Sequence, residues 1–419
     1  MGRIQQEKSG TQRHTFYFDP ASNLINDPTE KVINNRLSHY QGVRYTYDSL
    51  GNLTECQTAN GDYQRYTYDL KNRLVQADIH NRYTTESWVY DYDPLGRRIA
   101  KSKLNKQGEK QCHTQFIWAG SHLVQEIRKG NHQQNAEQTD RTFTYIYTHP
   151  DSYEPLAQCY KERENAQHTV NYFHCDQIGI PREMTDSQGK LLWKGRYDAW
   201  GQLIHDSNRH AQRSTHQPFR LQNQYFDQET GLHYNFLRYY EPALGRFITQ
   251  DPIGLMGGMN LYQFAENIQI WVDEFGLIPK KKLPCFEQLR DAYPNFNVEP
   301  SARPSSDSYA VNQCAIRVSS AMQKTGIDIK NLYPKGNQTS EGYARSSKGL
   351  ADWIWKNYGK PKQMSLSDFA NNSINLKGIF YELPKEGGIG HIDIIDQGKV
   401  GSGFYDAKEI WFWPMEDCK

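Results

Sequence analysis

Tyrosine alternates with polar residues in short stretches along the first two thirds of the chain. Residues 44–48 and 65–69 both read Arg-Tyr-Thr-Tyr-Asp, and each is soon followed by Gly-Asn-Leu or Asn-Arg-Leu. A period of two places successive side chains on opposite faces of a β-strand. Gly and Asn adopt positive φ readily and therefore favour a tight turn at this point. The pattern predicts that each phrase begins a β-hairpin.

The same phrase recurs, in complete or weaker form, along the chain. The copies lie at residues 18–24, 44–53, 65–74, 90–99 and 197–203. A hairpin with one apolar face cannot bury that face alone, so repeated hairpins stack on their neighbours. An ordinary antiparallel β-domain with chance similarity is the alternative, but the matching phrases argue against it. We therefore expect a β-repeat array over residues 1–170.

The pattern changes after residue 277. Pro279 and the three lysines that follow it form a charged linker of the kind that separates domains. Beyond the linker, apolar residues at spacings of three and four predict an amphipathic helix, on the face of Val311, Ala315, Val318 and Met322. Alternating stretches predict strands at residues 378–382, 388–396, 400–404 and 409–413. We expect an α+β domain, a helix packed on a small antiparallel sheet, over residues 278–419.

Composition limits the classes of function. The 419 residues suffice for two or three domains. The near balance of 49 basic and 48 acidic residues gives no reason to expect a nucleic-acid partner. No apolar run approaches the roughly 20 residues that a membrane span needs. The first residues lack the apolar segment of a signal peptide, so export would need a machine that does not read such a signal.

The cysteines favour neither a zinc ribbon nor a thioredoxin motif. Their number is odd, at seven, and no two have the spacing Cys-x-x-Cys. Three of them, Cys285, Cys314 and Cys418, lie in the expected C-terminal domain. A Cys285–Cys418 disulfide that leaves Cys314 free is one of the three pairings open to them, if this domain works outside the cytosol.

Cys314 lies where a cysteine can act as a nucleophile. The predicted helix begins near it, and Asp307, Ser308 and Asn312 in front of it are suitable N-cap residues. In the first turn of a helix, the free N–H groups and the dipole favour the reactive thiolate. The alternative is that Cys314 is a small core residue, as a helical cysteine usually is.

His391 supplies the base that a cysteine nucleophile needs. It follows Gly390 at the start of a predicted strand, and Asp393 lies two residues further, on the same face. A helix with Cys314 packed on a sheet with His391 is the arrangement of papain-like and NlpC-type cysteine peptidases. A purely structural histidine is the alternative reading.

Several further stretches belong to one recognisable pattern. They lie at residues 172–181, 197–201, 219–220, 225–227, 230–232, 235–240, 245–255, 260–262 and 273–277. With the Tyr-Asp phrases, they resemble the YD repeats and the Rhs-associated core domain of the Rhs family, over about residues 40–277. The resemblance implies a hollow shell of strands, with the core domain at residues 171–277. Since family shells have many more repeats, we expect either a fragment of a longer protein or a partial cap.

Asp251 and Asp273 each begin an Asp-x-x-Gly-Leu frame. Two carboxyl groups held close together cannot both ionise cheaply, so one acts as acid and the other as base. From spacing alone, turn or cap residues are the more ordinary reading. The resemblance to the Rhs family instead implies aspartyl self-cleavage between Leu277 and Ile278. In this reading Arg246 would steady the charge.

A second set of stretches lies in the C-terminal domain. They are Asn312-Gln-Cys-Ala-Ile-Arg317, Ala344-Arg345, Gly349-Leu-Ala-Asp352, Gly390-His-Ile-Asp393 and Ile410-Trp-Phe-Trp413. They resemble the type VI secretion amidase effectors, most closely the fourth such family, over nearly all of residues 285–415. The resemblance implies a D,L-endopeptidase that hydrolyses the γ-D-glutamyl–meso-diaminopimelate bond of peptidoglycan.

The same resemblance suggests a role for each residue. Cys314 would be the nucleophile, and its own backbone N–H would bind the oxyanion. His391 would be the general base and later the acid. Asp393 is the expected orienting residue, with Asp396 as the other available carboxylate. Arg317, one turn beyond the nucleophile, would bind a substrate carboxylate or simply lie on a solvated helix face.

The resemblances also imply partners. Neither a cofactor nor a metal is expected. We expect a peptidoglycan substrate, a cognate immunity protein, a type VI spike protein and a chaperone, with no nucleic acid and no membrane span. The protein would be made in the cytoplasm without a signal peptide, secreted, and active in the periplasm of a target cell. A Cys-His enzyme that modifies proteins, such as a deamidase or transglutaminase, and a non-enzymatic YD-repeat surface protein are the alternatives.

Overall fold

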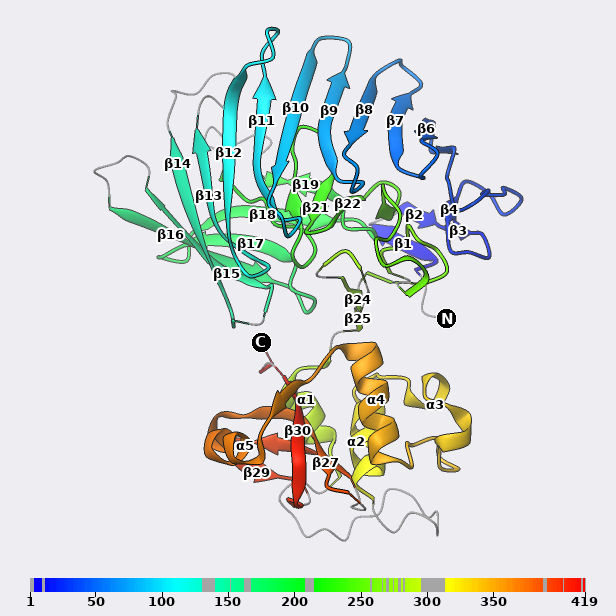
Figure 1. Cartoon of the computed structure of the whole chain (residues 1–419), viewed down its shortest axis with the longest axis vertical. Coiled ribbons are helices and arrows are strands. Elements are labelled where there is room, and N and C mark those ends of the chain that lie inside the picture. Colours follow the sequence, from blue (N-terminus) through cyan, green and yellow to red (C-terminus); the bar gives the residue numbers. More distant parts are fainter. Residues whose placement is uncertain are drawn as a thin grey trace. The chain divides into compact units, whose positions relative to one another are not determined.

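The alternating Tyr and Thr residues form strands of one large antiparallel sheet. The computed structural model describes residues 4–9, 12–129, 140–150, 152–161, 167–207, 215–256, 258–265, 267–268, 271–273, 275–277, 280–281, 283–294, 313–386, 390–401, 403–415 and 417–418. The chain divides into two compact units, Met1–Pro279 and Lys280–Lys419. Among the described residues of the first unit, fifteen strands, β5 to β19, pair in chain order (Figure 1).

The elements of the first unit are short and almost entirely β. They are β1 (Gln6–Ser9), β2 (Gln12–Thr15), β3 (Tyr17–Phe18), β4 (Leu24–Ile25), β5 (His39–Tyr40), β6 (Val43–Tyr47), β7 (Leu53–Thr58), β8 (Tyr63–Tyr68), β9 (Leu74–His80), β10 (Thr85–Tyr92), β11 (Arg98–Leu104), β12 (Lys110–Ala119), β13 (His122–Lys129), β14 (Arg141–Tyr147), β15 (Pro155–Lys161), β16 (His168–Cys175), β17 (Pro181–Asp186), β18 (Leu191–Tyr197), β19 (Leu203–Asp206), β20 (Tyr225–Phe226), β21 (His233–Asn235), β22 (Arg238–Glu241), β23 (Arg246–Phe247), the 3-10 helix η2 (Gly254–Met256) and β24 (Trp271–Val272).

The hairpins predicted from the Tyr-Asp phrases are confirmed. They join β3 to β4, β6 to β7, β8 to β9, β10 to β11 and β18 to β19. In the β6–β7 turn, Asp48 Oδ1 accepts the N–H of Asn52 at 2.8 Å, and Gly51 has a φ of 90°. Asn72 takes the same place in the β8–β9 turn, with a φ of 58°. The aspartate therefore closes each turn by hydrogen bonding to the returning strand.

One face of the large sheet is covered by the chain that follows it. Buried tyrosines of the repeats, such as Tyr45, Tyr66 and Tyr90, share a core with residues of β20 to β23. Arg98, completely buried, forms an ion pair of 2.5 Å with Asp227. A buried charge needs such a partner, so this pair ties the covering segment to the sheet. Residue 170 lies inside β16, so no boundary between units falls there.

The second unit combines helices with a small antiparallel sheet. Its elements are β25 (Lys280–Lys281), α1 (Phe286–Ala292), α2 (Cys314–Lys324), α3 (Ile329–Leu332), the 3-10 helix η3 (Lys335–Asn337), α4 (Ser347–Tyr358), β26 (Lys362–Met364), α5 (Leu366–Asn372), the 3-10 helix η4 (Ser373–Asn375), β27 (Lys377–Pro384), β28 (His391–Asp396), β29 (Lys399–Val400) and β30 (Ala407–Pro414). The sheet order is β26-β30-β27-β28-β29.

Helices cover both faces of this sheet. One face, with Ile379 and Ile392, packs against α1, α2 and α4. The other, with Phe380 and Phe412, packs against Phe369 of α5. The alternation of β27 and β28 thus separates two apolar clusters. The strand predicted at residues 400–404 is shorter in the structure, where β29 begins at Lys399, ends at Val400 and pairs with β28.

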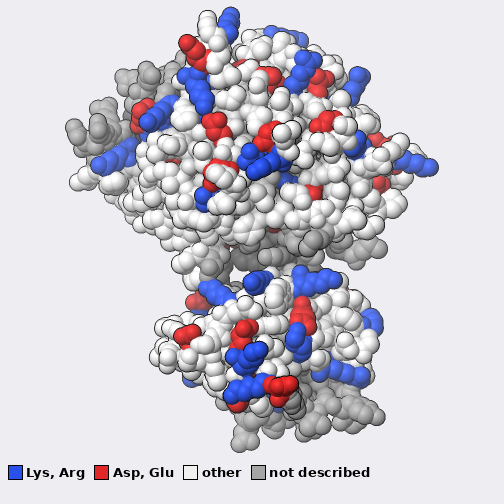
Figure 2. All heavy atoms as spheres, in the orientation of Figure 1, with Lys and Arg blue, Asp and Glu red and all other residues white. Residues whose placement is uncertain are grey.

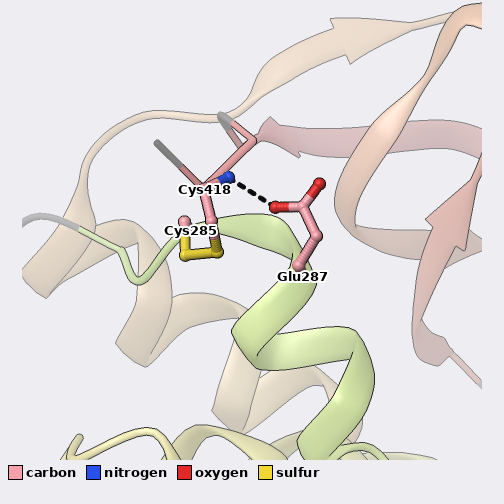
Figure 3. Close-up of side chains that lie close together, drawn as sticks. All are labelled: Cys285, Glu287 and Cys418. Atoms are coloured by element: carbon pink, nitrogen blue, oxygen red, sulfur yellow. Dashed lines mark hydrogen bonds between the residues drawn. A yellow bond between two sulfur atoms is a disulfide. The ribbon is translucent and has the colours of Figure 1, made fainter.

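Of the three pairings that the sequence left open, the structure has the Cys285–Cys418 disulfide, and Cys314 is a free thiol (Figure 3). The two Cα atoms are 5.0 Å apart, within the range that a disulfide spans. Cys285 precedes α1, and the N–H of Cys418 donates to Glu287 of that helix. Among the described residues, these three form the group close enough to hold a metal ion. In the disulfide, however, both sulfurs are already bonded.

No helix in the described ranges is long and apolar enough to cross a membrane. On the face drawn in Figure 2, basic and acidic side chains are interspersed over each of the two units. This distribution agrees with the near balance of charge in the sequence.

Candidate active site

Helix α2 carries Cys314 at its first position. Gln313 is the N-cap residue and its side chain makes no capping hydrogen bond. The three residues considered as N-caps from the sequence, Asp307, Ser308 and Asn312, lie outside the described residues. The N–H groups of the first turn have no partner within the helix, so they favour a thiolate at this position.

Strand β28 carries the predicted base and its partner. His391 is its first residue, and Asp393 lies on the same face, with Nε2 and Oδ2 3.5 Å apart. Both side chains are buried. The thiol of Cys314 hydrogen bonds with the side chain of His391. The structure therefore brings the three predicted residues together.

The thiol and the imidazole change each other's ionisation. Burial opposes ionisation of Cys314, but the hydrogen bond and charge of His391 outweigh burial and lower the pKa of the thiol below 9.0. Burial alone would lower the pKa of His391, yet its interactions with Asp393 and Cys314 raise that pKa to about 9. Both shifts favour a thiolate–imidazolium pair, the reactive state of a cysteine nucleophile.

Asp393 is itself held in place by residues distant in sequence. Its Oδ1 accepts the hydroxyl of Tyr293 at 2.5 Å and the N–H of Ile394 at 2.9 Å. A side chain at Gly401 would collide with this carboxyl group and with the ring of Tyr293. Tyr293 was missed in the sequence, where nothing near it marks a site. Its role depends on the packing of the segment after α1 beside β28.

The other two residues considered from the sequence take different positions. Asp396 pairs with Arg290 of α1 at 3.3 Å, so it faces away from the imidazole. Of the two aspartates, Asp393 is therefore the one that pairs with His391. Arg317 is buried in α2 rather than lying on a solvated helix face.

Two more residues lie next to His391, and neither was expected from the sequence. The ring of Tyr405 lies 4.4 Å from the imidazole, centroid to centroid. Glu382 of β27 is paired directly opposite His391 in the sheet. Burial raises the pKa of Glu382 to about 7. Only the register of the two strands reveals this neighbour.

In the first unit, Asp251 and Asp273 meet at a buried arginine. Arg238 Nη2 lies 3.0 Å from Asp251 Oδ2 and 3.6 Å from Asp273 Oδ2. Burial lowers the pKa of Arg238 to about 10, although the charges of Asp273 and Asp251 act to raise it. Burial also raises the pKa of Asp251, although the charge of Arg238 acts to lower it. The guanidinium also packs on the ring of Phe247, at 3.7 Å.

Arg246 lies elsewhere, which corrects the role expected for it. Its guanidinium donates to Asn23 at 2.9 Å and to the carbonyl of Asn35 at 2.5 Å. It therefore fastens the N-terminal segment, while Arg238 occupies the position beside the aspartates. The sequence could not rank these two arginines, because both belong to stretches of the same pattern.

Leu277 lies against this cluster. Its N–H donates to Asp273 Oδ1 at 2.8 Å, and its carbonyl is 3.5 Å from Arg238 Nη2. Arg238 also donates to the carbonyl of Gly276 and, at 3.1 Å, to that of Leu261. The carboxyl pair is thus close to the backbone at the end of the second Asp-x-x-Gly-Leu frame. Ile278, on the other side of the expected scissile bond, lies outside the described residues.

Two family models match parts of the chain. Residues 170–207 match the family described as RHS protein. Residues 310–413 match the family described as type VI secretion system (T6SS), amidase effector protein 4. The second match includes Cys314, His391 and Asp393.

Whole proteins are similar over larger parts of the chain. Double-stranded DNA deaminase toxin A of Burkholderia cenocepacia is 36% identical over 301 residues, which cover 67% of this chain and 20% of that protein. Toxin protein Tse5 of Pseudomonas aeruginosa is 35% identical over 265 residues, 58% of this chain and 19% of that protein. The chain thus spans about a fifth of these relatives. The Photorhabdus luminescens Tc holotoxin pore matches 64% of this chain and 15% of its own, at 19% identity and a TM-score of 0.43.

Proposed function

Since the chain is an Rhs protein whose C-terminal domain belongs to the type VI amidase effector protein 4 family, we propose that this domain is an antibacterial cysteine amidase that cuts peptidoglycan. The observation that carries the proposal is the joint burial of Cys314, His391 and Asp393, in which the thiol and the imidazole interact so that the pKa of Cys314 is lowered and that of His391 is raised. A helix bearing the cysteine beside a sheet bearing the histidine is also what a papain-like or NlpC-type hydrolase requires.

The proposed reaction proceeds through a thioester. The thiolate of Cys314 attacks the amide carbonyl, and the oxyanion binds the backbone N–H of Cys314. His391 gives its proton to the leaving amine as the C–N bond breaks. His391 then takes a proton from water, which attacks the thioester and releases the acid and the thiolate. Asp393 stabilises the imidazolium throughout.

We assign the γ-D-glutamyl–meso-diaminopimelate bond as the substrate bond, on the strength of the family resemblance. The test is digestion of purified Gram-negative sacculi by the full chain, wild type against Cys314→Ala, with the products identified by mass spectrometry. New stem fragments that end at the γ-D-glutamyl residue, and that the variant does not release, are the expected result. Folded wild-type protein that releases none would overturn the assignment and favour a protein-modifying enzyme.

We further propose that Asp251 and Asp273 hydrolyse the Leu277–Ile278 bond. Of the two carboxyl groups, the protonated one would donate to the carbonyl oxygen and the other would activate water. The contacts of Leu277 with Asp273 and Arg238 support this reading. The intact mass of purified protein tests it. Asp251→Asn should leave the chain uncut, whereas Arg246→Gln should still be cut, and an intact wild-type chain would contradict the proposal.

Delivery by type VI secretion and neutralisation by an immunity protein follow from the same family membership. We propose that a spike protein and a chaperone carry the chain, and that the domain acts in the periplasm of the target cell. Competition assays test this. Recipient cells should survive when the attacker lacks the secretion machine, carries Cys314→Ala, or meets recipients that express the immunity protein. Killing that is independent of Cys314 would refute the proposal.

A further inference from the structure

The sheet face that carries His391 also carries a buried carboxyl group that the proposed reaction does not use. Glu382 is paired with His391 across β27 and β28 and is 1% exposed. Its Oε1 accepts the N–H of Tyr405 at 2.9 Å. Its Oε2 is buried and has no hydrogen-bond partner within the described part of the chain. Such an incompletely satisfied group costs stability and calls for a functional reason.

The residue that Glu382 holds is itself in contact with the imidazole. The Tyr405 ring is inclined at 40° to the His391 ring, with the centroids 4.4 Å apart. Tyr405 is nevertheless 54% exposed, so its ring lies between the imidazole and solvent. The ring position therefore depends on the backbone that carries it, rather than on burial of the ring.

That backbone belongs to a short covering segment, residues 403–406. The neighbouring Phe404 packs on Phe380 and Phe369, with ring centroids 5.8 and 6.0 Å apart. Asp406 pairs with Lys385 at 2.8 Å, an exposed contact of little energetic weight. Glu382 is thus the buried polar anchor of a segment otherwise fixed by aromatic packing and one exposed ion pair.

We propose that Glu382 is a positioning residue: through the Tyr405 amide it holds the covering segment against His391 and so keeps the imidazole oriented toward Cys314. The inference rests on the proposed function of these two residues. The orientation of the imidazole matters because, when that ring turns, Cys314 and His391 lose the geometry that proton transfer between them requires. Burial raises the pKa of Glu382 to about 7, and both its ionised and its protonated form can accept the Tyr405 N–H.

The same residue could instead act by charge, since an ionised Glu382 would join Asp393 in stabilising the imidazolium. Positioning and charge stabilisation predict different effects for substitutions at position 382. An amide at position 382 keeps the acceptor for Tyr405 and removes the charge, whereas an aliphatic side chain removes both. Glu382→Gln and Glu382→Leu therefore separate positioning from electrostatics.

The test measures alkylation of Cys314 by iodoacetamide in the full chain. The Cys314 peptide is followed by mass spectrometry from about pH 5 to about pH 9, because only the thiolate reacts. We expect Glu382→Leu to slow alkylation near pH 6 by roughly tenfold and to shift the profile toward that of an ordinary thiol. Glu382→Gln should stay within about twofold of wild type. Equal effects of the two variants, or none in a folded Glu382→Leu, would overturn the proposal.

A second pair of variants covers the case in which Glu382→Leu does not fold. Tyr405→Ala removes the ring from an exposed site and should slow alkylation as Glu382→Leu does, while Tyr405→Phe should match wild type. An unchanged profile in Tyr405→Ala would also overturn the proposal. Because alkylation uses no peptidoglycan, this result does not depend on whether the proposed substrate is correct. Failure of the sacculus digestion and failure of this inference can therefore be told apart.

Discussion

At the scale of single residues, the proposed chemistry depends on how His391 stabilises the thiolate of Cys314. Neither group would ionise readily in isolation, because both are buried. Their interaction, reinforced by Asp393, reverses the effect of burial for both groups. Activity should therefore report directly on their ionisation.

The first prediction concerns pH. The rate should rise with pH as Cys314 loses its proton below pH 9.0, and fall as His391 loses its proton near pH 9. The sign follows because the thiolate attacks and the imidazolium protonates the leaving amine. The measurement is kcat/KM on a soluble stem peptide against pH. A rate that keeps rising well beyond pH 9 would contradict the assigned role of the imidazolium.

The second prediction concerns the orienting carboxylate. Asp393→Asn should reduce kcat on the order of 100-fold and move the alkaline limb of the pH profile to lower pH, since Asp393 helps to raise the pKa of His391. Asp396→Asn is the matched control and should retain most activity, because Asp396 pairs with Arg290 instead. The kinetics of both variants, measured at several pH values, test whether Asp393 or Asp396 orients the imidazole. A greater loss in Asp396→Asn would reassign the orienting role.

At the scale of elements, the site depends on how the chain after β29 packs on β28. Gly401 leaves the sheet directly beside Asp393, and the ring of Tyr293 closes the same space from the segment after α1. The turn into β30 then brings the covering segment over His391. The segment after α1 is far in sequence from strand β28 and the chain after β29, yet they meet around Asp393 and His391.

The third prediction tests that packing. Gly401→Ala would place a Cβ about 2.6 Å from the Tyr293 ring and in collision with the Asp393 carboxyl group. We expect loss of most activity and a stability cost of roughly 1–3 kcal/mol. Gly336→Ala, where nothing lies within 4 Å, is the control and should change neither. Activity and thermal unfolding of both variants provide the measurement, and a fully active Gly401→Ala would refute the packing argument.

At the scale of the whole molecule, the second unit is closed on itself by a disulfide near its two ends. Cys285 and Cys418 are 133 residues apart in sequence, so the bond restricts a long loop of the unfolded chain. Such a bond persists outside the cytosol and not in it. This agrees with a domain that works after export.

The fourth prediction follows from this closure. Replacing both Cys285 and Cys418 by Ser should lower the free energy of unfolding of this unit by roughly 3–5 kcal/mol. Calorimetry of the full chain should show the same transition shifted in the double variant and in reduced wild type. Cys112→Ser, at a cysteine of the other unit that forms no disulfide, should leave that transition unchanged. No shift on reduction would show that the bond contributes little.

The sequence by itself determined the features that depend on neighbouring residues. A period of two, with Gly or Asn after Asp, specified the hairpins, because strand faces and turn geometry are local properties. The spacing of apolar residues identified the helix that carries Cys314, and alternation placed His391 and Asp393 on one face of a strand. Those local rules made the strand at residues 400–404 too long, since β29 ends at Val400 and the next residue, Gly401, lies against Asp393 and Tyr293.

Only the tertiary structure decided which distant groups meet. It chose Arg238 over Arg246 as the partner of Asp251 and Asp273, and it brought Tyr293 to Asp393. It also set Glu382 opposite His391, through a strand register that β27 alone does not reveal. The physical reason is that periodicity fixes the direction of a side chain, whereas its partner depends on how separate elements fill a common core.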